Sequence, residues 1–89
     1  MIFREYDWDD VNIEHIAGHG VIPQEVEEAC FNEPLVRKIR ENRYIAYGRS
    51  DSGRYLFIVT IYKGKGVVRV ITARDMTDSE HRLYNRKRG

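Results

Sequence analysis

The sequence predicts one α+β domain over residues 1–89, with two N-terminal helices, a three- or four-stranded antiparallel meander sheet and a C-terminal helix. Before residue 31, apolar residues recur at helical spacing, as at Ile13, Ile16 and Ala17. From residue 35 the pattern becomes the alternation of strands. A capping box at Thr77–Glu80 then opens a last helix. This order favours helices on one side of an antiparallel sheet.

The N-terminal third contains an arm and two short helices. A short first strand or extended arm would include Ile2, Phe3 and Tyr6. Asp9 or Asp10 is expected to cap the first helix, which ends at Gly18. Pro23 suits the first turn of the second helix, and the segment 32–34 stops it. The inner face of this second helix carries Val26, Ala29 and Cys30.

Four strands are expected after the helices. They cover residues 35–40, 43–49, 54–62 and 67–74. The third strand is apolar on both faces, which is typical of a central strand. Turn sequences at residues 50–53 and 63–66 make its two neighbours antiparallel to it.

Simple hairpin registers place Arg43, Thr60 and Arg69 in one row on a more open sheet face. The opposite face would then pack on the two N-terminal helices. It would carry Tyr44, Phe57, Val59, Ile61, Val68 and Val70. A slip of one residue in either turn would reverse these assignments.

Charge is divided unevenly along the chain. Residues 1–36 carry one basic and nine acidic side chains, whereas residues 37–89 carry fourteen basic and five acidic ones. This asymmetry suggests a basic surface for a polyanion. Whatever the register, Arg49, Arg54 and Arg74 lie at the same end of the sheet, and the arginine fork matches phosphate. The alternative is that these arginines pair with acids of the other half.

The sequence lacks the motifs of several classes of function. The one cysteine, Cys30, cannot form an internal disulfide, which favours a reducing cytoplasm. The three histidines and Cys30 show no zinc-ligand spacing, and no phosphate loop or dinucleotide fingerprint is present. No apolar run has the length of a membrane helix. We therefore expect a cytoplasmic protein that uses neither a metal nor a cofactor and does not enter a membrane.

RNA cleavage fits the groups that this chain does offer. The ribose 2′-OH attacks its own phosphate, so the protein must orient it, move protons and stabilise the developing charge. Groups that could exchange protons are His19, Glu80, His81 and Tyr84. Tyr84 lies one helical turn after Glu80 and on the same face. Alternative explanations stay open, because capping accounts for Glu80, helix termination for His19, and solvated helix positions for His15 and His81.

The sequence also resembles a known family, the BrnT toxins. The resemblance rests on His19-Gly20-Val21, on Gly53-Arg54, and on Arg69–Arg74 followed by Met76-Thr77, Glu80 and Tyr84. It covers nearly the whole chain and implies a RelE-like fold. It also implies a ribonuclease toxin of a type II toxin–antitoxin pair that cleaves RNA and arrests translation. Its partner would be an antitoxin, usually with a ribbon-helix-helix DNA-binding part, in a hetero-oligomer, and the toxin itself could dimerise.

On this interpretation the chain is a metal-independent endoribonuclease. Arg54 and Arg74 would hold the scissile phosphate, His19 or Tyr84 would take part in proton transfer, and Glu80 would orient a group or act as a base. The flanking phosphates of RNA would be bound by Arg43, Arg49 and Arg69. The alternatives are a non-catalytic basic module that binds RNA or an acidic protein, and a structural domain whose charged halves only neutralise each other.

The chain departs from the family pattern near its N-terminus. Members often carry Lys directly before His-Gly, where this chain has Gly18, and Lys and Asn in the first helix, where it has Val11 and His15. A basic group that could touch RNA is therefore missing from this region.

Overall fold

The computed structural model describes residues 3–88, and over that range it contains three helices and five strands. The helices are α1 (Asp10–Ala17), α2 (Pro23–Phe31) and α3 (Asp78–Arg88). The strands are β1 (Glu5–Tyr6), β2 (Leu35–Arg40), β3 (Arg43–Arg49), β4 (Tyr55–Gly64) and β5 (Val67–Asp75). The α+β class is confirmed. Ile2, which belongs to the predicted arm, lies outside the described residues.

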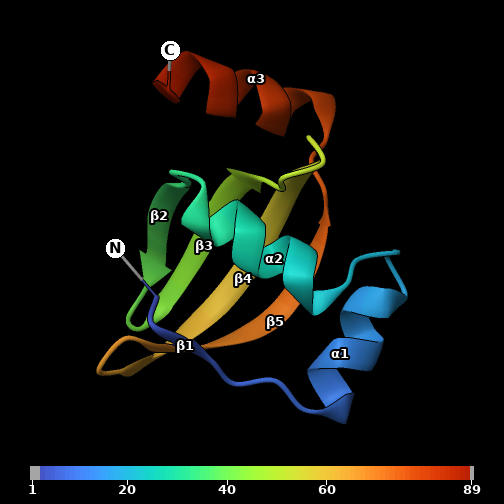
Figure 1. Ribbon diagram of the computed structural model, residues 1–89. Helices are drawn as coiled ribbons and strands as arrows, with labels where there is room; N and C mark the ends of the chain where they lie inside the picture. Colours follow the sequence, from blue (N-terminus) through green and yellow to red (C-terminus); the bar gives the residue numbers. More distant parts are fainter. Residues whose placement is uncertain (1–2, 89) are drawn as a thin grey trace.

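The strands form one mixed sheet in the order β1-β5-β4-β3-β2 (Figure 1). Strands β2 to β5 pair antiparallel with their neighbours. Strand β1 pairs parallel with β5, so that Tyr6 lies opposite Val68. The predicted purely antiparallel sheet is thus wrong at this edge, because a strand of two residues is too short to show an alternation in the sequence. None of the helices in residues 3–88 has the length and apolar character needed to cross a membrane.

The predicted registers of both hairpins are wrong by one residue. Arg43 and Arg69 do share a row, but the residue between them is Ile61 and not Thr60. The β3–β4 connection is longer than predicted because Arg49 pairs with Tyr55, and β4 runs on past residue 62 to Gly64. The two shifts leave β3 and the first part of β5, up to Val70, on the predicted faces and turn β4 over. A further irregularity between Val59 and Thr60 shifts the rest of β5, so that Ala73 faces the core and Arg74 the opposite side.

The helix-facing side of β4 is therefore the opposite of the one predicted. Leu56, Ile58 and Thr60 are fully buried against the N-terminal helices. Phe57, Val59 and Ile61, which were predicted to pack there, are only partly buried on the other face. Val68 and Val70 lie in the core as predicted.

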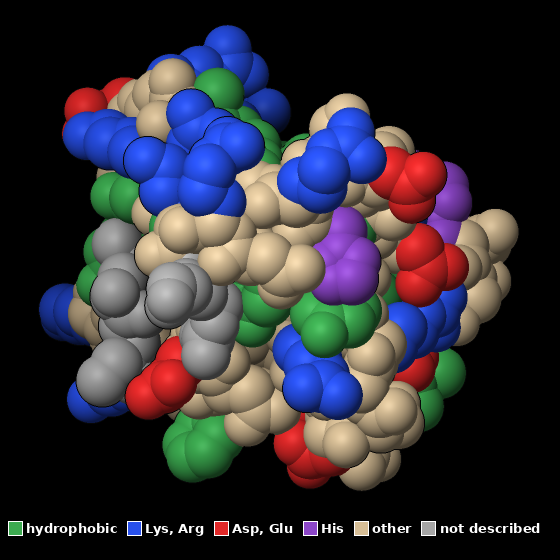
Figure 2. Space-filling model, turned by 90° about the horizontal axis from the view of Figure 1, so that it is seen from above, with side chains coloured by type: hydrophobic (Ala, Val, Ile, Leu, Met, Phe, Trp, Pro, Cys, Tyr) green, Lys and Arg blue, Asp and Glu red, His purple; other side chains and the backbone are tan. Residues whose placement is uncertain are grey.

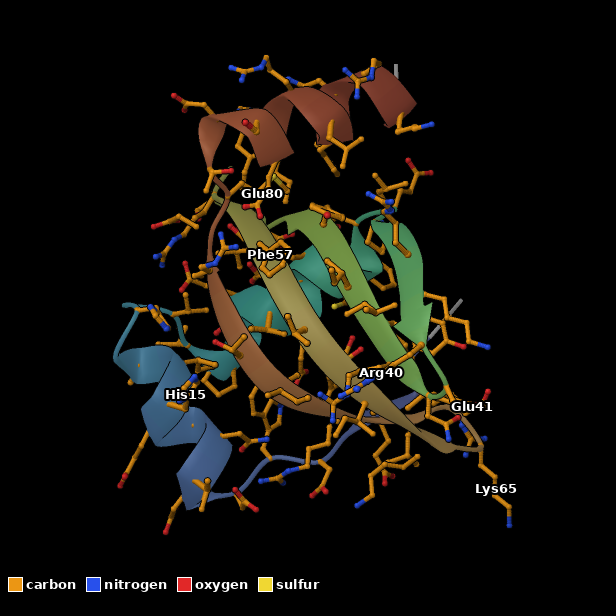
Figure 3. The ribbon with its side chains drawn as sticks, turned by 180° about the vertical axis from the view of Figure 1, so that it is seen from behind. His15, Arg40, Glu41, Phe57, Lys65 and Glu80 are labelled. Carbon is orange, nitrogen blue, oxygen red and sulfur yellow. The ribbon has the colours of Figure 1, made fainter. Side chains whose placement is uncertain are left out.

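Helices α1 and α2 cover one face of the sheet, and α3 lies over one end of the other face (Figures 1 and 3). The prediction that all helices lie on one side is thus wrong. Helix α2 approaches β3 very closely at Gly48, where an added Cβ would lie 2.3 Å from the carbonyl oxygen of Ala29. A residue without a side chain is required at that contact.

Helix α1 is attached to the edge of the sheet by a narrow stripe. Of its predicted apolar stripe only Ile16 is buried, whereas Ile13 and Ala17 are exposed. Asn12 takes their place, with 3% exposure. Its amide nitrogen donates to the carbonyls of Asp7 (2.8 Å) and Val70 (3.2 Å). A polar side chain therefore ties α1 to β5, which apolar periodicity alone does not reveal.

The same asparagine completes the cap of α1. Asp9 is the N-cap, and its side chain accepts from the backbone N–H of Asn12 at 3.2 Å. The Asn12 side-chain oxygen accepts in return from the Asp9 backbone N–H at 2.8 Å. This reciprocal pair is a capping box with Asn in the position that Glu or Gln usually occupies.

We predict that Asn12→Ala lowers the free energy of unfolding by about 1–3 kcal/mol, because one buried and one partly buried carbonyl lose a donor and the cap is broken. Chemical denaturation measures this value. Glu14→Ala is the matched control, since Glu14 is an exposed residue of the same helix. Equal effects of the two substitutions would contradict this role for Asn12.

Candidate functional site

Aromatic and charged side chains gather beneath α3, on the sheet face opposite α2. They come from β3, β4, β5 and α3, and we call them the α3 cluster: Tyr47, Arg49, Tyr55, Phe57, Arg74, Glu80, His81 and Tyr84. Strand pairing brings them together, since Phe57 lies opposite both Tyr47 and Arg74. Residues that oppose each other point to the same face.

Arg74 is held on two sides within the α3 cluster. Its guanidinium carbon lies 4.0 Å from the centre of the Phe57 ring, a cation–π contact. Its Nη1 and Nη2 donate to the two oxygens of Glu80 at 2.8 and 2.9 Å. Figure 3 shows Glu80 at the start of α3, above Phe57 on the exposed side of the sheet. The guanidinium thus has a fixed plane.

Glu80 is fixed in turn by the start of α3. It accepts from the Thr77 backbone N–H at 2.9 Å, and its own N–H donates to the Thr77 hydroxyl at 3.2 Å. The predicted capping box is confirmed. The hydrogen bond from Arg74 lowers the pKa of Glu80 below its ordinary value. The same bond raises the pKa of Arg74. A carboxylate so stabilised is a weak base, which favours an orienting role.

The rest of the α3 cluster is built around Tyr55. The ring of His81 lies 3.9 Å from the Tyr55 ring, centre to centre, and Tyr84 meets Tyr55 edge-on at 5.8 Å. The guanidinium of Arg49 lies 5.3 Å from the same ring. Tyr84 is buried, with 5% exposure, whereas His81 is partly open to solvent. The imidazole of His81 therefore lies against the same ring that the Arg49 guanidinium contacts.

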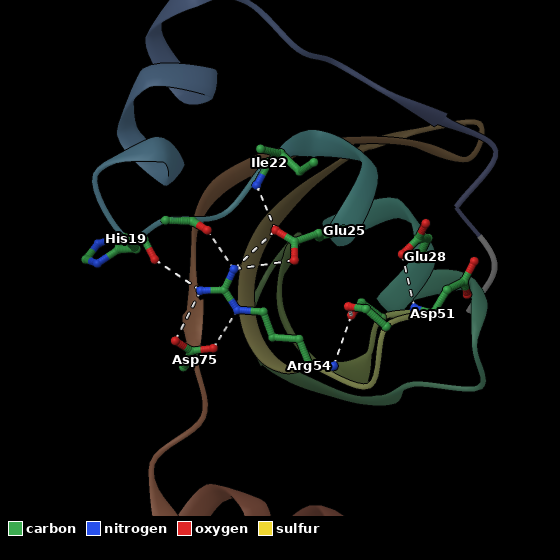
Figure 4. Close-up of polar contacts among 10 residues, drawn as sticks. His19, Ile22, Glu25, Glu28, Asp51, Arg54 and Asp75 are labelled. Carbon is green, nitrogen blue, oxygen red and sulfur yellow. Dashed lines mark hydrogen bonds and ion pairs between the residues drawn. The ribbon is translucent and has the colours of Figure 1, made fainter.

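Arg54 lies in a separate network that involves the start of α2 (Figure 4). Its Nε and Nη2 donate to the two oxygens of Asp75 at 2.7 and 3.1 Å. Nη1 donates to the Gly20 carbonyl at 2.6 Å and to Glu25 at 3.2 Å. Nη2 also donates to the His19 carbonyl at 3.3 Å. We call this group of residues the Arg54 network.

The two arginines predicted to hold the scissile phosphate thus differ in the donors they have left. All five N–H groups of Arg54 have partners in the protein. Arg74 makes three such bonds, two to Glu80 and one to the Asp75 carbonyl, so two of its N–H groups have no partner among the described residues. Arg74 is the better placed of the two to bind an added anion.

His19 belongs to the Arg54 side of the molecule. Its carbonyl binds Arg54, and Figure 4 shows its imidazole directed away from that guanidinium. The ring lies 5.8 Å from the ring of His15, whose Nε2 is 3.2 Å from the Thr72 hydroxyl. The contacts of His19 therefore join it to α1 and to the Arg54 network, and none joins it to the α3 cluster within residues 3–88.

The three arginines predicted to bind flanking phosphates have unlike surroundings. Arg69 is ion-paired to Asp9 at 2.9 Å and to Asp7 at 3.5 Å. The side chain of Arg43 makes no hydrogen bond or ion pair within the part of the chain that the structure describes. Arg49 contacts Tyr55 as part of the α3 cluster. Pairing between the charged halves thus occurs at Arg54, Lys63 and Arg69, and it leaves other cations without an acidic partner in the described range.

Figure 2 views the molecule from the end that α3 covers. Lys and Arg side chains gather along one edge, while the histidines and several acidic side chains lie on the other side. Arg82, Arg86 and Lys87 of α3 are exposed and have no acidic partner among the described residues. A positive surface therefore adjoins the α3 cluster.

Sequence reasoning did not give three residues the places that they take in these groups. Asp75 was not considered, although it joins Arg54 through its carboxylate and Arg74 through its carbonyl. Phe57 was assigned to the core. His81 was named as a group that could exchange protons, with a solvated helix position as the alternative, and it was not assigned to catalysis. The pairing of Phe57 with Arg74 depends on the register of β4 and also on an irregularity between Val59 and Thr60, without which Phe57 would lie opposite Ala73.

Comparisons with known proteins identify the family. The sequence model of a ribonuclease toxin, BrnT, of type II toxin–antitoxin systems matches residues 8–80. That match covers most of the chain and includes Arg54, Arg74, Asp75 and Glu80. A search of curated proteins found no match. The chain therefore belongs to the BrnT family of type II toxin–antitoxin ribonuclease toxins.

Proposed function

We propose that this protein cleaves RNA, inhibits translation, and is neutralised by a cognate antitoxin that carries a ribbon-helix-helix DNA-binding part. We also propose that its two N-terminal helices and its β2–β5 meander form a RelE-like arrangement. One observation carries the catalytic part. Glu80 holds the Arg74 guanidinium over the Phe57 ring, and two N–H donors of Arg74 have no protein partner among the described residues.

The α3 cluster suits attack of the ribose 2′-OH on the adjacent phosphate. Charge develops on the phosphoryl oxygens in that transition state, and fixed donors stabilise it without having to reorient. Arg74 supplies such donors, and Arg49 supplies a second guanidinium nearby. His81 and Tyr84 are the groups that could transfer protons to or from the 2′- and 5′-oxygens. Glu80 orients Arg74.

Arg54 and His19 take a different part in this proposal. The Arg54 network joins the α1–α2 loop to the end of β5, so we assign Arg54 a positioning role. Contact of Arg54 or His19 with RNA stays a prediction from the sequence. RNA on either side of the cleaved bond would lie along the open sheet face, where Arg43 has no protein partner in the described range.

Arg74→Ala is predicted to lower the rate of RNA cleavage by about 10²–10³-fold and to relieve growth arrest in a bacterial host. Purified protein and a labelled RNA measure the rate. The matched control is Arg86→Ala, since Arg86 is an exposed α3 arginine without an acidic partner among the described residues. If wild type and Arg74→Ala arrest growth equally, the assignment of Arg74 to catalysis is wrong. RNA binding without cleavage by wild type would support the non-catalytic basic module instead.

The role of Glu80 as an ion partner predicts an acid-sensitive fold. Its pKa is lowered in the folded protein, so its stabilisation is present above the ordinary pKa of 4.5 and is lost as pH falls through the folded value. The pKa of Asp75 is likewise lowered, by Arg54. The free energy of unfolding should therefore fall as pH decreases from 5 towards 3, and Glu80→Gln should flatten this slope. Denaturant unfolding across this range measures it, and an unchanged slope in Glu80→Gln would contradict the ion pair.

A further inference from the structure

A hollow of about 610 Å³ lies beside the C-terminal end of α2. Phe3, Tyr6, Cys30 and Pro34 give it an apolar floor. A second hollow of about 630 Å³ shares Phe31, Glu33 and Asp51 with the first and continues to Ser50 and Arg49. We call the two together the acidic groove.

Phe31 stands in both hollows and is 86% exposed. It is the last residue of α2 and the most exposed of the large apolar side chains described in the structure. A large aromatic ring exposed to water beside an apolar hollow indicates a binding surface, because a partner that covers it buries apolar area. Aromatic anchors of this kind supply much of the affinity of protein interfaces.

The rim of the groove is acidic and largely unneutralised. Glu27, Glu28 and Asp51 line it, and none of them has a Lys or Arg partner within residues 3–88. Among the described residues their hydrogen-bond donors are neutral groups, such as the Trp8 indole, which donates to Glu27 at 2.7 Å, and the Asn32 amide, which donates to Asp51 at 2.9 Å. These carboxylates repel the phosphates of RNA and attract cations.

The floor adds no charge of its own. Burial raises the pKa of the Cys30 thiol to about 12, and burial together with Cys30 raises the pKa of Tyr6. Both groups are therefore neutral at physiological pH. An apolar floor beneath a carboxylate rim selects a segment that carries an apolar side chain flanked by Lys or Arg.

We propose that the acidic groove binds a basic segment of the antitoxin, which packs an apolar side chain against Phe31 and pairs its cations with Glu27, Glu28 and Asp51. The partner itself comes from the proposed function, so the inference rests on it. The α3 cluster lies on the other face of the sheet and stays the site of RNA cleavage. The groove ends at Arg49, which belongs to that cluster, so a segment filling both hollows also reaches its edge.

A second copy of this chain is the rival occupant. Its α3 offers cations, but the exposed residues of that helix include no large apolar anchor in the described range. Strand β2 offers an exposed Ile39 beside Arg37 and Arg40. Self-association through the groove is therefore an outcome that the test must separate from binding of the antitoxin.

The test is titration of the full-length toxin with the purified antitoxin encoded in the same operon. Phe31→Ser is expected to weaken binding by about tenfold or more. Glu27→Gln with Glu28→Gln keeps the hydrogen-bond acceptors, removes two charges, and should weaken binding and flatten its salt dependence. Val11→Ser is the control, because Val11 is also an exposed apolar residue (73%) and belongs to α1. Unchanged affinity in both groove variants, or a loss only of self-association in sedimentation, overturns the proposal.

A growth assay separates this proposal from the proposed function. Phe31→Ser lies outside the α3 cluster, so it should still arrest growth while the co-expressed antitoxin no longer rescues the host. If this variant arrests growth and is rescued as fully as wild type, the groove assignment is wrong and the ribonuclease assignment stands. If wild type leaves RNA intact but still binds the antitoxin through the groove, the ribonuclease assignment fails and the groove assignment stands.

Discussion

The arrangement of the site depends on the hydrogen bonds that Arg54 makes with Asp75, Glu25 and the carbonyls of His19 and Gly20. These bonds join the end of β5 to the α1–α2 loop and to the first turn of α2. Neutral loop carbonyls and two carboxylates converge on one guanidinium, and a planar fork with five donors is the side chain that can satisfy them together. Without this junction no side-chain hydrogen bond among the described residues would connect the start of α2 with the end of β5.

Asp75 carries that constraint across to the other face of the sheet. Its side chain is directed to the Arg54 network, and the neighbouring Arg74 projects to the opposite face, as successive strand residues do. The Asp75 carbonyl also accepts from Arg74 at 3.1 Å. One residue thus anchors two arginines with different roles. Arg54, whose N–H groups all have partners, holds the scaffold. Arg74, which has two N–H groups without a partner among the described residues, faces the partly open α3 cluster.

The two sheet faces also divide the charges of the chain. The acidic N-terminal half supplies the ion pairs to Arg54 and Arg69 and the rim of the acidic groove. The basic C-terminal half supplies α3 and the arginines of the α3 cluster. Neutralisation between the halves is therefore real but partial. The opposite signs that remain on two separate surfaces suit two different partners, a polyanion and a basic protein segment.

Local patterns in the sequence were sufficient for the elements but not for their registers. The capping box at Thr77–Glu80, the central position of β4 and the fold class could all be predicted, because each depends on short-range spacing. The side of the sheet to which each β4 residue points could not be predicted, because one extra residue in each hairpin turns the strand over. The turn sequence Ser50–Gly53 does not show how many residues the loop contains. Arg54 and Arg74 look alike in sequence, and only their partners in space distinguish an anchor from a candidate catalytic group.

The central claim is that Arg74 performs chemistry and Arg54 holds the fold. The most direct measurement compares Arg54→Lys with Arg74→Lys for thermal midpoint and for RNA cleavage rate, at a temperature well below both midpoints. The account predicts that Arg54→Lys lowers the midpoint by several degrees, about 4–8 °C for each kcal/mol lost, and cleaves RNA at nearly the wild-type rate once folded. Arg74→Lys should lose about a hundredfold in rate with a smaller change in midpoint. Loss of cleavage in Arg54→Lys with an unchanged midpoint would contradict the account.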